Sequence, residues 1–144
     1  MKYLVLLGRI LYSSIFVMSA FGHFSSQTIG YAASVGVPFA SIAVPLSGVM
    51  AILGGLSVAF GFKAKYGAVV LALFLIPVTF MMHNFWAVPD PMMARMQQAM
   101  FFKNFAMLGS AFLISYFGSG PLSLDSVLSA RRVHITRTKH PVTA

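Results

Sequence analysis

Nitrogen-bearing side chains lie near one end of three strongly apolar segments of the chain. Imidazole, amide and ammonium groups can donate hydrogen bonds to a carbonyl, and imidazole can also accept or give a proton near neutral pH. Neighbouring aromatic residues, Phe85 and Phe102 among them, could form walls for a flat apolar ring. These residue types match the needs of a quinone head group. The candidate ligand-binding residues are His23, His83, Asn84, Trp86, Lys103 and Asn104.

Other interpretations of these residues stay open. Histidine and lysine near a membrane interface often extend to lipid head groups without any function, and they can also form a partner-binding surface. Two histidines on separate helices could ligate haem axially, but no further ligand pattern supports haem. The sequence predicts no metal site, because acidic residues and further histidines are missing at matching positions.

Four long apolar segments must position these side chains. The chain has 144 residues, of which 58% are hydrophobic and only 8% are charged, whereas soluble domains carry about 25% charged residues. We therefore predict an all-α membrane protein, a bundle of four transmembrane helices. The predicted helices cover about 3–24, 42–62, 66–86 and 99–117. They form a domain of residues 1–130, with short surface helices within 25–37 and at 123–130, and a basic, disordered tail at 131–144.

The basic residues are unequally divided between the two sides of the predicted bundle. One side carries Lys2, Arg9, Lys63, Lys65, Arg131, Arg132, Arg137 and Lys139, and the other carries Arg95 and Lys103. Basic residues favour the cytoplasmic side of a membrane. This rule places both termini in the cytoplasm and the candidate ligand-binding residues in the outer leaflet. It also accounts for the net charge of +8 without a nucleic-acid partner.

Arg9 lies inside the first predicted helix and needs a partner. Steps of three and four residues place Arg9, Phe16 and His23 on one face, which we expect to point into the bundle. The chain has only two acids, Asp90 and Asp125, and Asp125 alone lies on the side of Arg9. We predict that the segment after the last helix folds back so that Asp125 approaches Arg9 as a structural ion pair. Backbone carbonyls and a lipid phosphate are the alternatives.

Two further features concern packing and chemistry. Small residues repeat every four positions in the second predicted helix, so a neighbouring helix can approach closely. This helix-packing stripe consists of Ser47, Ala51, Gly55 and Ala59. The chain contains no cysteine, which excludes thiol redox chemistry and cysteine-ligated metals from the chain itself.

Short motifs along 3–125 together resemble the DoxX family of small four-helix membrane proteins. The resemblance rests on their order and spacing: Gly8-Arg9-Ile10-Leu11, Ser19-Ala20-Phe21-Gly22-His23-Phe24, Gly30-Tyr31-Ala32, Gly36-Val37-Pro38, Gly54-Gly55-Leu56, Gly61-Phe62-Lys63, His83-Asn84-Phe85-Trp86, Phe102-Lys103-Asn104-Phe105-Ala106-Met107-Leu108-Gly109 and Gly118-Ser119-Gly120-Pro121-Leu122-Ser123-Leu124-Asp125. The chain differs from the family pattern at His23, because many members have a lysine near this position.

The resemblance implies a multi-pass protein of the bacterial plasma (inner) membrane. It also implies a quinone-linked oxidoreductase or an oxidative-stress redox complex, in which this chain is a membrane subunit with a soluble or membrane redox partner. We predict a quinone as ligand, no intrinsic cofactor, and an activity that depends on partners if the chain is an enzyme. The alternative function is a non-catalytic scaffold that recruits a soluble partner enzyme through the basic tail. The sequence leaves the oligomeric state open.

Overall fold

The computed structural model describes residues 1–139. All its regular elements are helical within those residues, and four helical segments are long and apolar enough to cross a membrane, as predicted. The elements are α1 (Lys2–Ala20), the 3₁₀ helix η1 (Phe21–Phe24), α2 (Ser26–Ser34), α3 (Ala40–Phe60), α4 (Ala64–Met82), the 3₁₀ helix η2 (Phe85–Ala87), α5 (Pro91–Phe117) and α6 (Leu124–Lys139).

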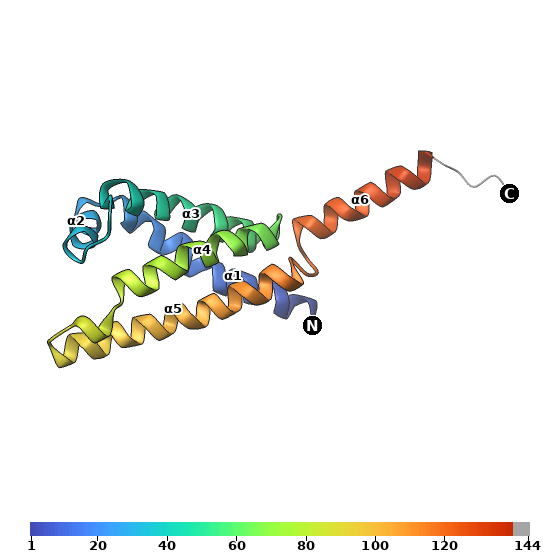
Figure 1. Cartoon of the computed structure of the whole chain (residues 1–144). Helices are drawn as coiled ribbons and strands as arrows, with labels where there is room; N and C mark the ends of the chain where they lie inside the picture. The colour runs from blue at the N-terminus through green and yellow to red at the C-terminus, as the bar shows by residue number, and fades with distance from the viewer. Residues whose placement is uncertain (140–144) are drawn as a thin grey trace.

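The four long helices pack in sequence order, α1 on α3, α3 on α4 and α4 on α5 (Figure 1). The outer members α1 and α5 are joined where the Tyr12 hydroxyl donates a hydrogen bond of 3.2 Å to the carbonyl of Met107. One end of the bundle, here called the α2 end, carries α2 and the loop with η2, and the N-terminus lies at the opposite end. From that opposite end α6 projects away from the bundle.

Buried and exposed faces of the helices match a bundle in hydrocarbon. Arg9, Ser13, Phe16 and Ala20 are the buried residues of α1, which is the face that the residue spacing predicts. Large apolar side chains such as Leu53 are exposed along the long helices. In a bilayer these outer faces contact lipid, which is as apolar as a leucine side chain.

Glycines bring α3 close to both of its neighbours. A Cβ on Gly55 would lie 2.9 Å from the Val17 side chain of α1, so this member of the predicted stripe lies at the α1 contact. On the other side, a Cβ on Gly54 would lie 3.0 Å from the carbonyl of Gly67 on α4. The Gly54–Gly67 approach is a second close helix contact that the stripe Ser47, Ala51, Gly55 and Ala59 does not include.

Helix ends differ from the sequence prediction where local capping decides them. α5 begins at Pro91 instead of 99, because the Asp90 side chain accepts the Met93 N–H at 2.7 Å and proline suits the first helical position. α4 ends at Met82 and η2 follows.

α6 continues to Lys139, past the predicted end at 130 and into the tail predicted to be disordered, while residues 140–144 of that tail lie outside the described part. Its first turn is capped by reciprocal bonds between Ser123 and Ser126, and no glycine or proline interrupts it.

Candidate functional site

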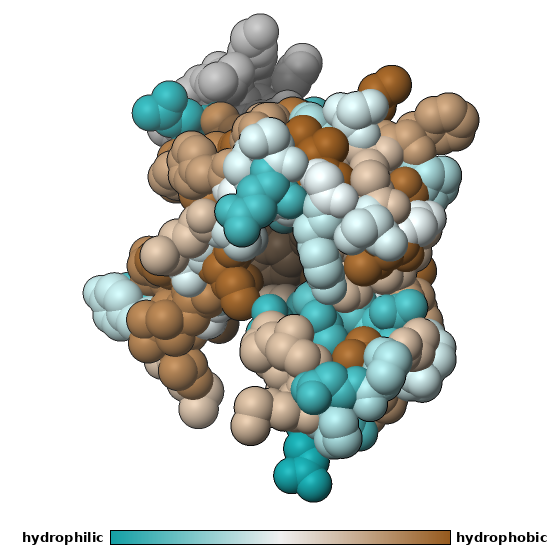
Figure 2. All heavy atoms as spheres, turned by 90° about the vertical axis from the view of Figure 1, so that its left-hand side faces the viewer, coloured by the Kyte–Doolittle hydropathy of each residue, from teal (hydrophilic) through white to brown (hydrophobic). Residues whose placement is uncertain are grey.

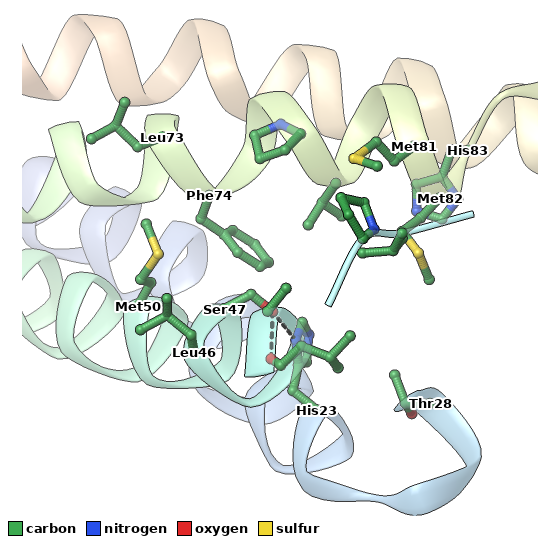
Figure 3. Close-up of a pocket in the computed structure, with 16 residues that line it drawn as sticks. His23, Thr28, Leu46, Ser47, Met50, Leu73, Phe74, Met81, Met82 and His83 are labelled. Carbon is green, nitrogen blue, oxygen red and sulfur yellow. Dashed lines mark hydrogen bonds between the residues drawn. The ribbon is translucent and has the colours of Figure 1, made fainter. Parts of the chain in front are cut away.

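Two adjoining cavities lie in the half of the bundle nearest α2. The larger one, of about 380 Å³, is lined by η1, the start of α2 and the facing halves of α3 and α4 (Figure 3). Its walls are mostly aliphatic, proline and methionine side chains, with His23, Thr28, Ser47 and His83 as the polar groups. A largely apolar cleft with a few polar groups, at this volume, is typical of a small-molecule site. Viewed from this end, the surface has a hollow bordered by both polar and apolar residues (Figure 2).

The smaller cavity, of about 160 Å³, lies between α1, α4 and α5. It shares four lining residues with the larger cavity, namely His23, Phe74, Val78 and His83. Lys103 and Asn104 line it from α5. The structure thus brings four of the six sequence-predicted ligand residues to one place, with both histidines in the shared wall.

His23 is fixed by contacts with α3. Its Nδ1 lies 2.7 Å from the Ser47 Oγ, and that hydroxyl donates a bond of 2.6 Å to the carbonyl of Val44 (Figure 3). Gly48 allows the histidine to come this close, since a Cβ there would lie 2.8 Å from the Cβ of His23. The imidazole also packs beside the Phe74 ring, with 5.7 Å between ring centroids. Ser47, predicted only as a packing residue, therefore also orients a candidate ligand residue.

His83 is held from the other side by a chain of polar side chains. It follows the last residue of α4, and its Nδ1 lies 2.7 Å from Gln97 Oε1 on α5. The Gln97 amide nitrogen donates to the Tyr31 hydroxyl of α2 at 3.3 Å. Sequence reasoning missed Gln97 and Tyr31, because residues 66 positions apart along the chain meet only in the tertiary structure.

The two residues from α5 differ in exposure. Asn104 is only 4% exposed, lines the smaller cavity, and makes no side-chain hydrogen bond with any described residue. Lys103 lines the same cavity although its side chain is largely exposed, and its ammonium lies 3.5 Å from the Met100 sulfur. In the described part of the chain, the fully buried side-chain polar atoms that lack a hydrogen-bond partner are Arg9 Nε and Ser13 Oγ. The Asn104 amide is not one of them and is a polar group accessible from the smaller cavity.

Asn84 and Trp86 line neither cavity. Trp86 is 60% exposed and packs in an aromatic cluster near the start of α5, with ring centroids 5.2 Å from Phe85 and 5.8 Å from Phe101. Phe102 belongs to the same cluster. The rings that the sequence suggested as cavity walls thus pack against one another, mostly edge to face. The aromatic residues that line the cavities are Phe74, in both, and Phe16, in the smaller one.

Arg9 holds the segment after α5 at the opposite end of the bundle. Its guanidinium donates bonds of 2.6 Å to the carbonyls of Ser119 and Leu122. The Ser119 hydroxyl in turn donates to the carboxylate of Asp125. The segment after α5 folds back onto Arg9, and Ser119 links Arg9 to Asp125. A direct ion pair of Arg9 and Asp125 stays a prediction. Backbone carbonyls are the direct partners of the arginine.

Asp125 ties the same segment to the turn between α3 and α4. Its carboxylate accepts the Lys63 N–H at 3.0 Å, and its own N–H donates to the carbonyl of Gly61 at 3.0 Å. Partial burial opposes ionisation, but the hydrogen bonds from Lys63, Ser119 and Ala64, together with the Arg9 charge, lower the pKa of Asp125 below its ordinary value of 3.8. We call residues 118–125, with these contacts, the docked segment.

Among residues 1–131, whose side chains the structure describes, no group of three or more His, Asp or Glu side chains is arranged to hold a metal ion. The polar groups that line the cavities include two imidazoles, an amide and an ammonium beside an apolar chamber. Such groups can orient a small ring and exchange protons with it.

Comparison with known proteins places the chain in a family. The family model DoxX matches residues 4–84, more than half of the chain. Inner membrane protein YqjF of Escherichia coli is 29% identical over 129 residues, covering 88% of this chain and 93% of that protein. Inner membrane protein YphA of the same organism is 26% identical over 124 residues, covering 85% and 88%. No solved structure matches the chain significantly. With four helices able to span a bilayer, the protein is an inner membrane protein that belongs to the DoxX family.

Proposed function

We propose that this DoxX protein is the membrane subunit of a quinone-linked oxidoreductase and that it binds a quinone-type ring at the two cavities. The observation that carries the proposal is the position of His23 in η1 and His83 after the end of α4, which both stand in the wall shared by the two cavities. The apolar chamber suits the ring and the start of its lipid tail. The imidazoles, with Asn104 and Lys103, suit the two ring oxygens.

Access from the bilayer supports a lipid-soluble ligand. Leu46 and Leu73 both line the larger cavity, and they are 56% and 58% exposed. Both lie within membrane-spanning helices, so their exposed surface contacts lipid. A ligand dissolved in the membrane can therefore enter between α3 and α4 without crossing water.

In this proposal, the side chains of this chain transfer protons and a partner protein transfers electrons. Reduction of a quinone takes two electrons and two protons. The imidazoles can hold or move protons at the ring oxygens, while a redox group on a partner protein would carry the electrons. The chain is then a non-autonomous subunit.

The membrane orientation in this proposal follows from charge. The N-terminus and α6 lie at one end of the bundle, together with the predicted cytoplasmic residues such as Lys63 and Lys65. The positive-inside rule makes that end cytoplasmic. The α2 end and both cavities then face the outer leaflet.

A cavity-filling substitution tests the proposal. We expect Val78→Trp to block labelling of the protein in lipid nanodiscs by a photoreactive short-chain quinone, because Val78 stands in the shared wall. Val69→Trp, on the lipid-exposed face of the same helix, is the matched control and keeps labelling. Mass spectrometry would locate the label at cavity residues in the wild type. Equal labelling of both variants, or labelling confined to other surfaces, would remove the site.

A second candidate function rests on α6. This helix projects from the bundle (Figure 1), and Leu124, Val127 and Leu128, which fall on one helical face, are 43–50% exposed. Four basic residues follow at 131–139. Such a helix suits recruitment of a soluble partner enzyme to the membrane. The scaffold function requires that deletion after Ser129 abolishes activity in cells while alanine at His23 and His83 leaves it intact, and the opposite pattern supports the quinone site.

A further inference from the structure

The bonds around His23 fix which of its nitrogens carries the proton. The Ser47 hydroxyl has a single proton, and it donates that proton to the carbonyl of Val44. Its oxygen must therefore accept from His23 Nδ1, which lies 2.7 Å away. In the neutral imidazole, Nε2 then has no proton and presents a lone pair.

The same tautomer follows at His83. Gln97 directs its amide oxygen at His83 Nδ1 and its amide nitrogen at the Tyr31 hydroxyl. An amide oxygen only accepts, so His83 Nδ1 carries the proton and Nε2 is again a lone-pair acceptor. Neither Nε2 atom has a hydrogen-bond partner among the described residues, and both histidines line both cavities.

A backbone carbonyl adds a third acceptor. Pro77 has no N–H, so the carbonyl of Leu73 lacks its usual helical donor. Leu73 and Pro77 both line the larger cavity. The side of the site formed by η1 and α4 is therefore rich in acceptors, and Asn104 and Lys103 across the smaller cavity supply the donors.

We propose that Ser47 and Gln97 are positioning residues that hold both imidazoles as acceptors, so that the site selects a hydroquinone over the oxidised quinone. This inference rests on the proposed function and specifies the redox form that binds. A hydroquinone has two O–H groups, one for each Nε2, and its oxygens can still accept from Asn104 and Lys103. An oxidised quinone has only acceptors, which would face the two imidazole lone pairs without a proton between them.

The test compares one ligand in its two redox forms. A short-chain hydroquinone and its quinone are titrated anaerobically against the full-length protein in nanodiscs. We expect the hydroquinone to bind at least about tenfold more tightly, the ratio that about 1.4 kcal/mol gives. In parallel, ¹⁵N NMR of labelled histidines should show His23 and His83 protonated at Nδ1 and bare at Nε2.

Two substitutions test the positioning residues. Ser47→Ala should release the His23 tautomer in the NMR spectrum and reduce the hydroquinone preference by roughly threefold or more. Ser14→Ala is its matched control, because Ser14 also donates to the carbonyl three residues earlier but is exposed on α1. At the second histidine, Gln97→Leu should lower the preference and Gln97→Glu should restore it, since carboxylate oxygens accept from Nδ1 as the amide does.

The possible results distinguish failure of the redox selectivity from failure of the proposed quinone site. Equal binding of the two forms, tighter binding of the quinone, or histidines protonated at Nε2 in the wild type would overturn the selection while leaving the quinone site in place. Binding of neither form would overturn the proposed function together with the inference. If Ser47→Ala fails to fold, the Gln97 pair and the wild-type spectrum still decide.

Discussion

Replacing Arg9 by methionine should loosen the docked segment. Arg9 is 4% exposed, and its two bonds to the carbonyls of Ser119 and Leu122 are short. A hydrogen bond to a charged group contributes about 1.5–3 kcal/mol to stability, and an unsatisfied buried donor costs about 1–3 kcal/mol. Two bonds are lost in Arg9→Met, but the buried Nε, which has no partner, is removed as well. We therefore expect a net destabilisation of about 2–3 kcal/mol.

Two measurements check this expectation. Unfolding of the purified protein in mixed micelles, followed by circular dichroism during titration with a denaturing detergent, gives the change in free energy. Hydrogen exchange of residues 118–125 shows whether the docked segment opens, and we expect its exchange to accelerate. Arg95→Met, at an exposed position of α5, should change stability by less than about 0.5 kcal/mol. If Arg9→Met is no more destabilising than Arg95→Met, or leaves exchange of 118–125 unchanged, the arginine does not hold this segment.

Three further predictions concern helix approach, acid and capping. Gly54→Ala should destabilise the bundle, because its Cβ would press on the Gly67 carbonyl. Gly109→Ala has open space around its Cβ and should be neutral or stabilising by up to about 1 kcal/mol. The free energies of unfolding of the two variants are compared. Because folding lowers the pKa of Asp125, its carboxylate stabilises the folded protein above the ordinary pKa of 3.8, and this stabilisation is lost as the pH falls through the pKa of the folded state. Hydrogen exchange of residues 118–125 should therefore become faster in acid. Asp125→Asn should remove that pH dependence. Ser123→Ala should weaken the start of α6 by about 1 kcal/mol, seen as faster exchange of 124–130, and unchanged exchange there would exclude Ser123 as the cap.

The candidate site shows where sequence reasoning stops. The positions of His23 and His83 near the ends of apolar segments predict a shared level in the membrane, because helical rise is fixed. Which groups bind their Nδ1 atoms is not predictable in that way, since Ser47 and Gln97 reach them only across helix contacts. Phe74 likewise belongs to the cavity only because α4 turns that side toward α1 and α3.

The sequence by itself determined that the chain lies in a lipid bilayer, that it is all-helical, and which face of α1 is buried. Long apolar segments with few charges must become helices in a bilayer, because every backbone polar group there needs an internal partner. The tertiary structure alone decided that Arg9 binds carbonyls of the docked segment, that α3 approaches α4 at Gly54 and Gly67, and that two cavities meet at the histidines. These features depend on how helices rotate and pack against one another, and residue spacing along one helix does not say which residues of another helix lie against it.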